Sequence, residues 1–156
     1  MTPGNKVTVS VTVEADPATA FRLFTEETDL WWRRGPKFRA AGRAPGVIRF
    51  EPRLGGALIE TFDHQSCVTG TITAWDPPRC FKFEWRGVNF APGESTEVDV
   101  LFEAVPAGTR VTVHHSGWAL IRPDHPVRHG LPVAAFIRNL GMWWADLLTS
   151  LREHAA

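Results

Sequence analysis

Two ionisable residues of this sequence fall where they could do chemistry inside a fold. Glu60 shares the face of its segment with the apolar residues Leu58 and Phe62. His115 shares the face of its own segment with Val113. If both faces point inward, burial raises the pKa of a carboxyl group and lowers that of an imidazole, which suits acid–base chemistry. The alternative is that each side chain makes an internal hydrogen bond to the backbone or to water. Both interpretations stay open at this point.

The remaining histidines do not form a metal-binding pattern. His125 and His129 are one helical turn apart, but Pro126 lies between them, and the nearby Asp124 and the more distant His114 add no fixed geometry. A zinc site needs three or four converging ligands. The sequence also has no glycine-rich phosphate loop and no nucleophile-elbow motif. We therefore predict no metal and no other cofactor, and assign no catalytic residue.

Charge and composition exclude several classes of function. The chain has 17 Lys and Arg against 17 Asp and Glu, so its formal net charge is zero, and we expect no nucleic-acid partner. No apolar run reaches the roughly 18–20 residues that span a bilayer, and the alternating residues 1–14 are unlike a signal peptide.

A hairpin near residue 76 would separate Cys67 from Cys80 by about 20 Å. Because this distance is too long for a disulfide, we expect two reduced thiols. Reduced thiols without a secretion signal indicate a cytoplasmic location.

Aromatic residues are unusually distributed, with seven Trp, ten Phe and no Tyr. Such side chains can fill a core or line a ligand cavity, and the sequence leaves both interpretations open. Gly141 interrupts an otherwise apolar helical pattern at a cost of about 1 kcal/mol relative to Ala. It indicates either room for a ligand or a close approach of the sheet, or else a simple notch in the packing.

The periodicity of apolar residues predicts an α+β domain over residues 1–156. Residues 7–13 alternate as a strand, and two short helices follow, the first beginning at Asp16-Pro17 and the second covering 26–32. Six short segments of period two between residues 46 and 116 predict an antiparallel meander. Apolar residues then recur every three or four positions from 133 to 151, which predicts one long amphipathic helix. We expect the helices to lie on one face of the antiparallel sheet, which is the arrangement that defines the α+β class.

Several motifs, spread from residue 16 to residue 118, carry a resemblance to a known family. They are Asp16-Pro17, Leu30-Trp31-Trp32, Pro52-Arg53-Leu54-Gly55-Gly56 with Glu60, Gly70 with Trp75-Asp76-Pro77-Pro78, Phe83-Glu84-Trp85, Thr96-Glu97-Val98, Thr109-Arg110-Val111 and His115-Ser116-Gly117-Trp118. In combination they resemble the helix-grip superfamily called START-like or SRPBCC, and within it the activator of heat-shock-protein-90 ATPase homologue-like family. The resemblance implies a curved seven-stranded antiparallel sheet around a long C-terminal helix, with a cavity between them. The segment 123–140 is richer in Pro and His than the family pattern, which bears on the identity of the ligand.

The resemblance implies three functions. The first is binding or carriage of a small hydrophobic molecule, the second a polyketide cyclase or dehydratase-like reaction using Glu60 or His115, and the third a protein-partner role toward a chaperone. We expect the first, with Glu60 and His115 as polar anchors and Trp118 at the cavity rim. The pattern specifies neither the ligand nor an oligomeric state. The expected ligand-binding residues are Glu60, Trp85, Val100, Val113, His115, Trp118, Phe136, Leu140 and Trp144.

Overall fold

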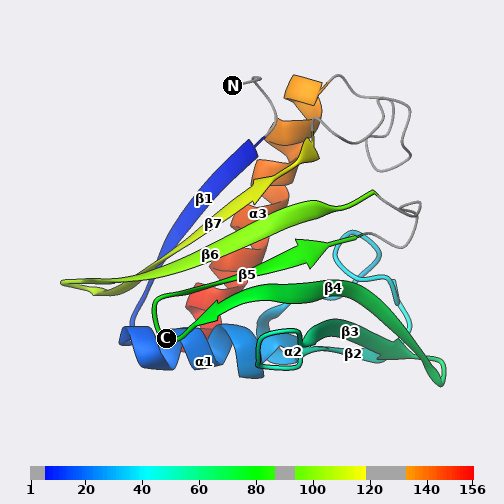
Figure 1. Ribbon diagram of the computed structural model, residues 1–156, viewed down its shortest axis with the longest axis horizontal. Helices are drawn as coiled ribbons and strands as arrows, with labels where there is room; N and C mark the ends of the chain where they lie inside the picture. The colour runs from blue at the N-terminus through cyan, green and yellow to red at the C-terminus, as the bar shows by residue number, and fades with distance from the viewer. Residues whose placement is uncertain (1–5, 87–93, 119–132) are drawn as a thin grey trace.

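The computed structural model describes residues 6–86, 94–118 and 133–156. It has the predicted α+β helix-grip architecture, in which one curved antiparallel sheet of seven strands packs against a long C-terminal helix (Figure 1). The strand order β1-β7-β6-β5-β4-β3-β2 places β1 beside β7 and leaves β1 and β2 at the two edges. The elements are β1 (Lys6–Val13), α1 (Pro17–Glu26), α2 (Thr28–Trp31), β2 (Gly46–Phe50), β3 (Ala57–Phe62), β4 (Gln65–Asp76), β5 (Cys80–Trp85), β6 (Thr96–Val105), β7 (Gly108–Ser116) and α3 (Val133–Ala155).

The first helix begins where the sequence predicts. Asp16 is its N-cap, and the Asp16 carboxylate accepts a hydrogen bond from the Thr19 backbone N–H at 2.8 Å. Pro17 occupies the first turn, where its missing N–H costs nothing. The second helix, α2, is a single turn and shorter than the predicted 26–32. Together the two helices close one end of the curved sheet (Figure 1).

The strand β4 does not keep a regular alternation of inward and outward side chains along its first half. The pairing of β4 with β3 shifts register between Leu58 and Ile59, which is a β-bulge on β4. As a result Val68 is 59% exposed, whereas Thr69 is only 7% exposed. Val68 therefore does not share the inward face of Ile72, because the bulge adds one residue to the strand and moves the following side chains to the other face.

Aromatic rings from helix and sheet form the core at the closed end. Phe24 of α1 contacts Phe81 and Phe102 edge to face, with ring centroids 5.5 and 5.9 Å apart. The C-terminal half of α3 covers this core with Leu147 and Leu151, both fully buried. Part of the aromatic content is therefore core, as one of the two interpretations expects.

Gly141 lies where α3 approaches the edge strand β1. A Cβ atom at this position would lie 3.2 Å from Cγ2 of Val7, so glycine permits a close approach of helix and sheet. Cys67 and Cys80 are free thiols and are not bonded to each other, as predicted. In the strand register, Cys67 lies opposite Glu60 of β3, and Cys80 lies opposite Asp76. Within the described ranges, none of the helices is both long and apolar enough to cross a membrane.

Candidate functional site

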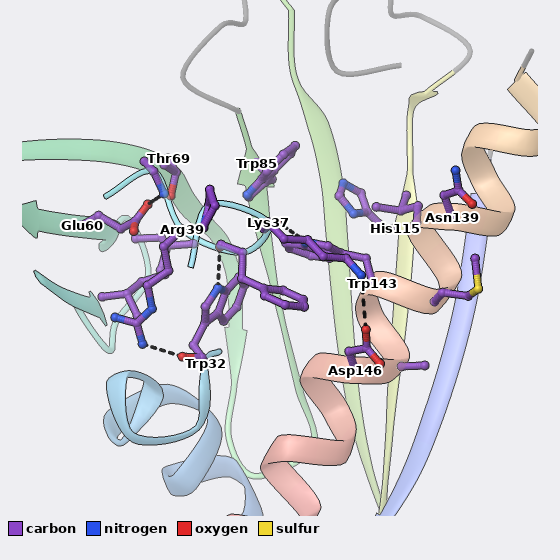
Figure 2. Close-up of a pocket in the computed structure, with 18 of the residues that line it drawn as sticks. Trp32, Lys37, Arg39, Glu60, Thr69, Trp85, His115, Asn139, Trp143 and Asp146 are labelled. Atoms are coloured by element: carbon purple, nitrogen blue, oxygen red, sulfur yellow. Dashed lines mark hydrogen bonds and ion pairs between the residues drawn. The ribbon is translucent and has the colours of Figure 1, made fainter. Parts of the chain in front are cut away.

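A cavity of about 980 Å³ lies between the N-terminal half of α3, the sheet and the segment 36–40 (Figure 2). The sheet contributes residues of β2, β3, β4, β5 and β7 to its wall. The wall is mainly apolar, and six of its side chains are aromatic. The aromatic residues that line it are Trp32, Phe38, Trp85, Trp118, Phe136 and Trp143.

Three of the expected ligand-binding residues lie away from this wall. Val100 and Val113 are completely buried in the packed core, and Trp144 is 1% exposed beneath the cavity. Alternation along a strand gives the side that a residue faces, but not whether the helix touches the sheet at that point. The other six line the cavity: Glu60, Trp85, His115, Trp118, Phe136 and Leu140.

Trp118 does not lie at the cavity rim, where we expect it from the sequence. Its ring is fully buried and lies between His115 and Phe136, with centroid distances of 4.9 and 4.8 Å. The reason is local: Gly117 has a φ of 95°, which turns the chain after β7 so that Trp118 packs inward. Of the residues considered as metal ligands, Asp124, His125 and His129 lie outside the described part of the chain.

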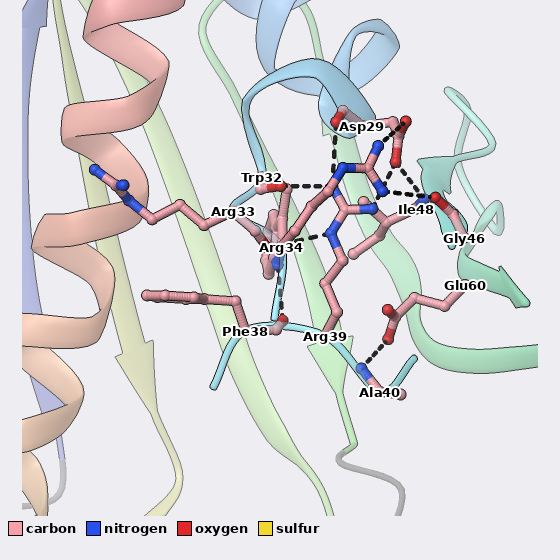
Figure 3. A network of polar contacts seen from close by, with 10 residues as sticks. All are labelled: Asp29, Trp32, Arg33, Arg34, Phe38, Arg39, Ala40, Gly46, Ile48 and Glu60. Carbon is pink, nitrogen blue, oxygen red and sulfur yellow. Dashed lines mark hydrogen bonds and ion pairs between the residues drawn. The ribbon is translucent and has the colours of Figure 1, made fainter. Parts of the chain in front are cut away.

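The segment 36–40, which follows α2 and forms neither helix nor strand, makes one wall of the cavity. Its anchor is Arg39, whose side chain is only 2% exposed (Figure 3). The Arg39 guanidinium donates from Nη1 to Oδ1 of Asp29 at 2.6 Å, from Nη2 to the Asp29 and Trp32 carbonyls, and from Nε to the Arg33 carbonyl at 3.1 Å. Four of its five N–H donors are thus used to hold the segment against α2.

Asp29 is the anionic centre of this network. Its carboxylate also accepts hydrogen bonds from the Ile48 backbone N–H at 3.0 Å and from Nη2 of Arg34 at 3.1 Å. Partial burial raises the pKa of Asp29, but the hydrogen bonds from Arg39 and Ile48 and the charges of both arginines outweigh it, so the pKa is lowered overall. The carboxylate therefore stays ionised and ties α2, β2 and the segment 36–40 together.

A second anchor fixes the segment to α3. The Trp143 indole N–H donates to the Lys37 carbonyl at 2.7 Å, and the Trp143 ring stacks on Phe38 with centroids 5.9 Å apart. The Lys37 ammonium lies 3.5 Å from the Asp146 carboxylate. The segment therefore bridges α2 and α3 across the cavity. The sequence signal for it was an aromatic residue, Phe38, inside a basic loop that follows Trp31-Trp32.

His115 is a fully hydrogen-bonded structural residue. The Trp144 indole N–H donates to Nδ1 of His115 at 3.0 Å, so Nδ1 carries a lone pair and the proton of the neutral ring is on Nε2. Nε2 then donates to the Thr96 hydroxyl at 2.7 Å, and that hydroxyl donates to the Trp85 carbonyl at 3.1 Å. Burial lowers the pKa of His115 to about 3. The imidazole thus lines the cavity with its ring while both nitrogens are occupied.

Glu60 lies at the opposite end of the cavity and is 4% exposed. Its Oε2 accepts the Ala40 backbone N–H at 2.8 Å, the one hydrogen bond that the described residues give it. The bulge in β4 brings Thr69 beside it (Figure 2). Three strands separate β3 from β7, so Glu60 and His115 are about 19 Å apart along the sheet. The two ionisable groups do not converge.

Comparison with known proteins agrees with this geometry. The profile of the family described as "Activator of Hsp90 ATPase homolog 1-like protein" matches residues 14–138. The chain belongs to this family. No curated protein is similar enough in sequence to match the chain.

Solved structures share the fold of this Activator of Hsp90 ATPase homolog 1-like chain. The solution structure of the Aha1 dimer from Colwellia psychrerythraea is 17% identical, covers 96% of this chain and 95% of its own, and has a TM-score of 0.66. Protein BH1534 from Bacillus halodurans is 16% identical over 97% and 96% of the two chains, with a TM-score of 0.67. CalU16 from Micromonospora echinospora is 16% identical over 94% and 71%, with a TM-score of 0.58. At these identities the likeness shows the fold.

Proposed function

We propose that this protein binds or carries a small, largely apolar molecule in the cavity between the sheet, α3 and the segment 36–40. The observation that carries the proposal is the cavity itself, about 980 Å³ with mainly apolar walls, six aromatic side chains and a few polar groups. Small-molecule sites typically have roughly 300–1,000 Å³ and this kind of lining. Trp32, Trp85 and Trp143 bring aromatic rings to the wall from the end of α2, from β5 and from α3, which suits a ligand with a flat hydrocarbon skeleton.

Binding accounts for the polar groups better than the polyketide-cyclase alternative does. An acid–base reaction that uses Glu60 and His115 together needs both groups to converge on the substrate. His115 has its single lone pair occupied by the Trp144 N–H, and three strands separate its strand from that of Glu60, so the two groups do not form an acid–base pair. A chaperone-partner role rests on the family description alone. We also propose a cytoplasmic location, where the unpaired Cys67 and Cys80 stay reduced.

Ligand titration followed by intrinsic fluorescence and melting temperature tests the proposal. Fatty acids, flavonoids and polyketide-like aromatics are the probes, because the lining tryptophans report on any molecule that enters. Leu140→Arg places a charge in the cavity wall and should abolish binding, whereas Leu30→Arg, the same change at a residue 68% exposed on α2, should not.

Asn139→Trp is a second variant, since it narrows the cavity from an exposed position of α3 without disturbing the core. Circular dichroism confirms that each variant folds. Binding that survives both Leu140→Arg and Asn139→Trp in folded protein contradicts the proposal, as does a failure of every probe to bind the wild type.

A further inference from the structure

The cavity has one polar end, formed by Glu60 and Thr69. Glu60 is 4% exposed and Thr69 7%, and both line the cavity wall. Glu60 is held by one backbone N–H, that of Ala40, through Oε2. Among the described residues, the second carboxylate oxygen and the Thr69 hydroxyl make no hydrogen bond. Neither atom is among the fully buried side-chain atoms that lack a partner, so both remain accessible from the cavity.

The two cationic side chains that line the cavity, Lys37 and Arg39, already have partners. Arg39 is paired with Asp29 at 2.6 Å and uses three further donors on backbone carbonyls. Lys37 is paired with Asp146 at 3.5 Å and lies over the Phe38 ring. No ion pair to Glu60 is present in the described parts of the chain. The second oxygen of Glu60 is therefore an acceptor in the cavity wall that no donor of the described residues meets.

Resting on the proposed function, we infer that the ligand is a ring-containing apolar molecule with one hydrogen-bond donor. The donor is a protonated amine or a hydroxyl, and Glu60 and Thr69 accept its hydrogen bonds. The amine or hydroxyl donates to the free oxygen of Glu60, and a hydroxyl or amine nitrogen also meets the Thr69 Oγ1. The apolar skeleton lies against Trp32 and Trp85, whose ring faces attract a nearby cation. Carboxylate ligands such as fatty acids are disfavoured, because their charge would face that of Glu60.

Four probes with one skeleton test the inference: methylnaphthalene, naphthylmethanol, naphthylmethylamine and naphthoate. Affinities measured by calorimetry at pH 7 should rank the amine and the alcohol at least about tenfold tighter than naphthoate, as expected for a charge-assisted hydrogen bond against like-charge repulsion. Glu60→Gln keeps an acceptor for the Ala40 N–H but removes the charge, and should reduce the amine-to-naphthoate ratio to below about threefold.

Two further variants separate a local effect from a general one. Thr69→Val removes the hydroxyl at nearly constant shape and should weaken naphthylmethanol by about threefold to tenfold, with methylnaphthalene unchanged. Glu84→Gln removes a carboxylate from the exposed face of β5 and should leave all four affinities as in the wild type.

The outcomes distinguish the inference from the proposed function. If methylnaphthalene and the other three probes all fail to bind, the cavity is not a ligand site and both fall. If methylnaphthalene binds but naphthoate binds as tightly as the amine, only the inference is overturned. A Glu60→Gln variant that folds and keeps the wild-type preference overturns the inference as well, because the preference then has another origin.

Discussion

Acid should weaken this fold through one residue, His115. Its ring is 1% exposed, and its Nδ1 accepts the Trp144 N–H, so protonation of the folded protein must break that bond and bury a charge. Burial lowers the pKa of His115 from 6.5 to about 3. The unfolded chain takes up the proton below pH 6.5, while the folded protein does so only near pH 3. The stabilisation is therefore complete above pH 6.5 and is lost as the pH falls from 6.5 toward 3.

The size of the effect follows from these two pKa values. Within this window the free energy of unfolding should fall by about 1.4 kcal/mol per pH unit, because one proton is taken up on unfolding. Between pH 7 and pH 5 the loss due to His115 is then about 2 kcal/mol. Asp29 does not interfere, because its lowered pKa makes its contribution disappear only in more acidic solution, below its ordinary value of 3.8.

Urea unfolding at pH 7 and pH 5 measures this loss directly. His115→Gln should be less stable than the wild type at pH 7, but its stability should fall by about 2 kcal/mol less between the two pH values. His114→Gln is the matched control, because His114 lies next in the chain on the opposite face of β7, where its Nδ1 meets the Thr8 hydroxyl at 2.8 Å. Equal pH dependence in the wild type and His115→Gln would refute the reasoning.

Three other substitutions have definite expected effects on stability, measured by chemical unfolding at pH 7. Leu147→Ala should cost about 2–5 kcal/mol, because a fully buried side chain leaves a cavity under α3. Gly70→Ala should cost about 1–3 kcal/mol, since the added Cβ would lie 2.5 Å from the Glu84 carbonyl oxygen and force the strands apart. Asp29→Ala should cost at least about 2 kcal/mol, because it leaves the buried Arg39 guanidinium without its anion. A loss below about 0.5 kcal/mol in any of them would contradict the packing or pairing described for that residue.

The order and type of the elements could be predicted from the sequence, because each follows from local periodicity. The alternation around β1 and the spacing of Phe136, Leu140 and Leu147 specify a strand and a helix without knowledge of the rest. The inward directions of Glu60 and His115 are also correct. His115 does make internal hydrogen bonds, but its partners are the Trp144 and Thr96 side chains and not the backbone or water that the second interpretation expects.

The site itself could be predicted only in part, because it depends on contacts between distant segments. A register shift of one residue places Thr69 inward and Val68 outward, and nothing in the alternation of β4 marks it. The wall at 36–40 exists because Asp29 pairs with Arg39, an interaction between residues ten positions apart. Whether Val100 meets the helix or the cavity depends on the curvature of the sheet, which single strands do not encode.

The indole N–H resonances of the tryptophans test the central claim most directly. Trp32, Trp85, Trp118 and Trp143 line the cavity, while Trp31 and Trp75 pack in the core against Phe24 and Phe21. In a two-dimensional NMR titration with naphthylmethylamine, the resonances of the four lining tryptophans should shift together and saturably, and those of Trp31 and Trp75 should stay in place. Shifts confined to Trp31 and Trp75, or no saturable shift at any lining tryptophan, would contradict a ligand site between the sheet and α3.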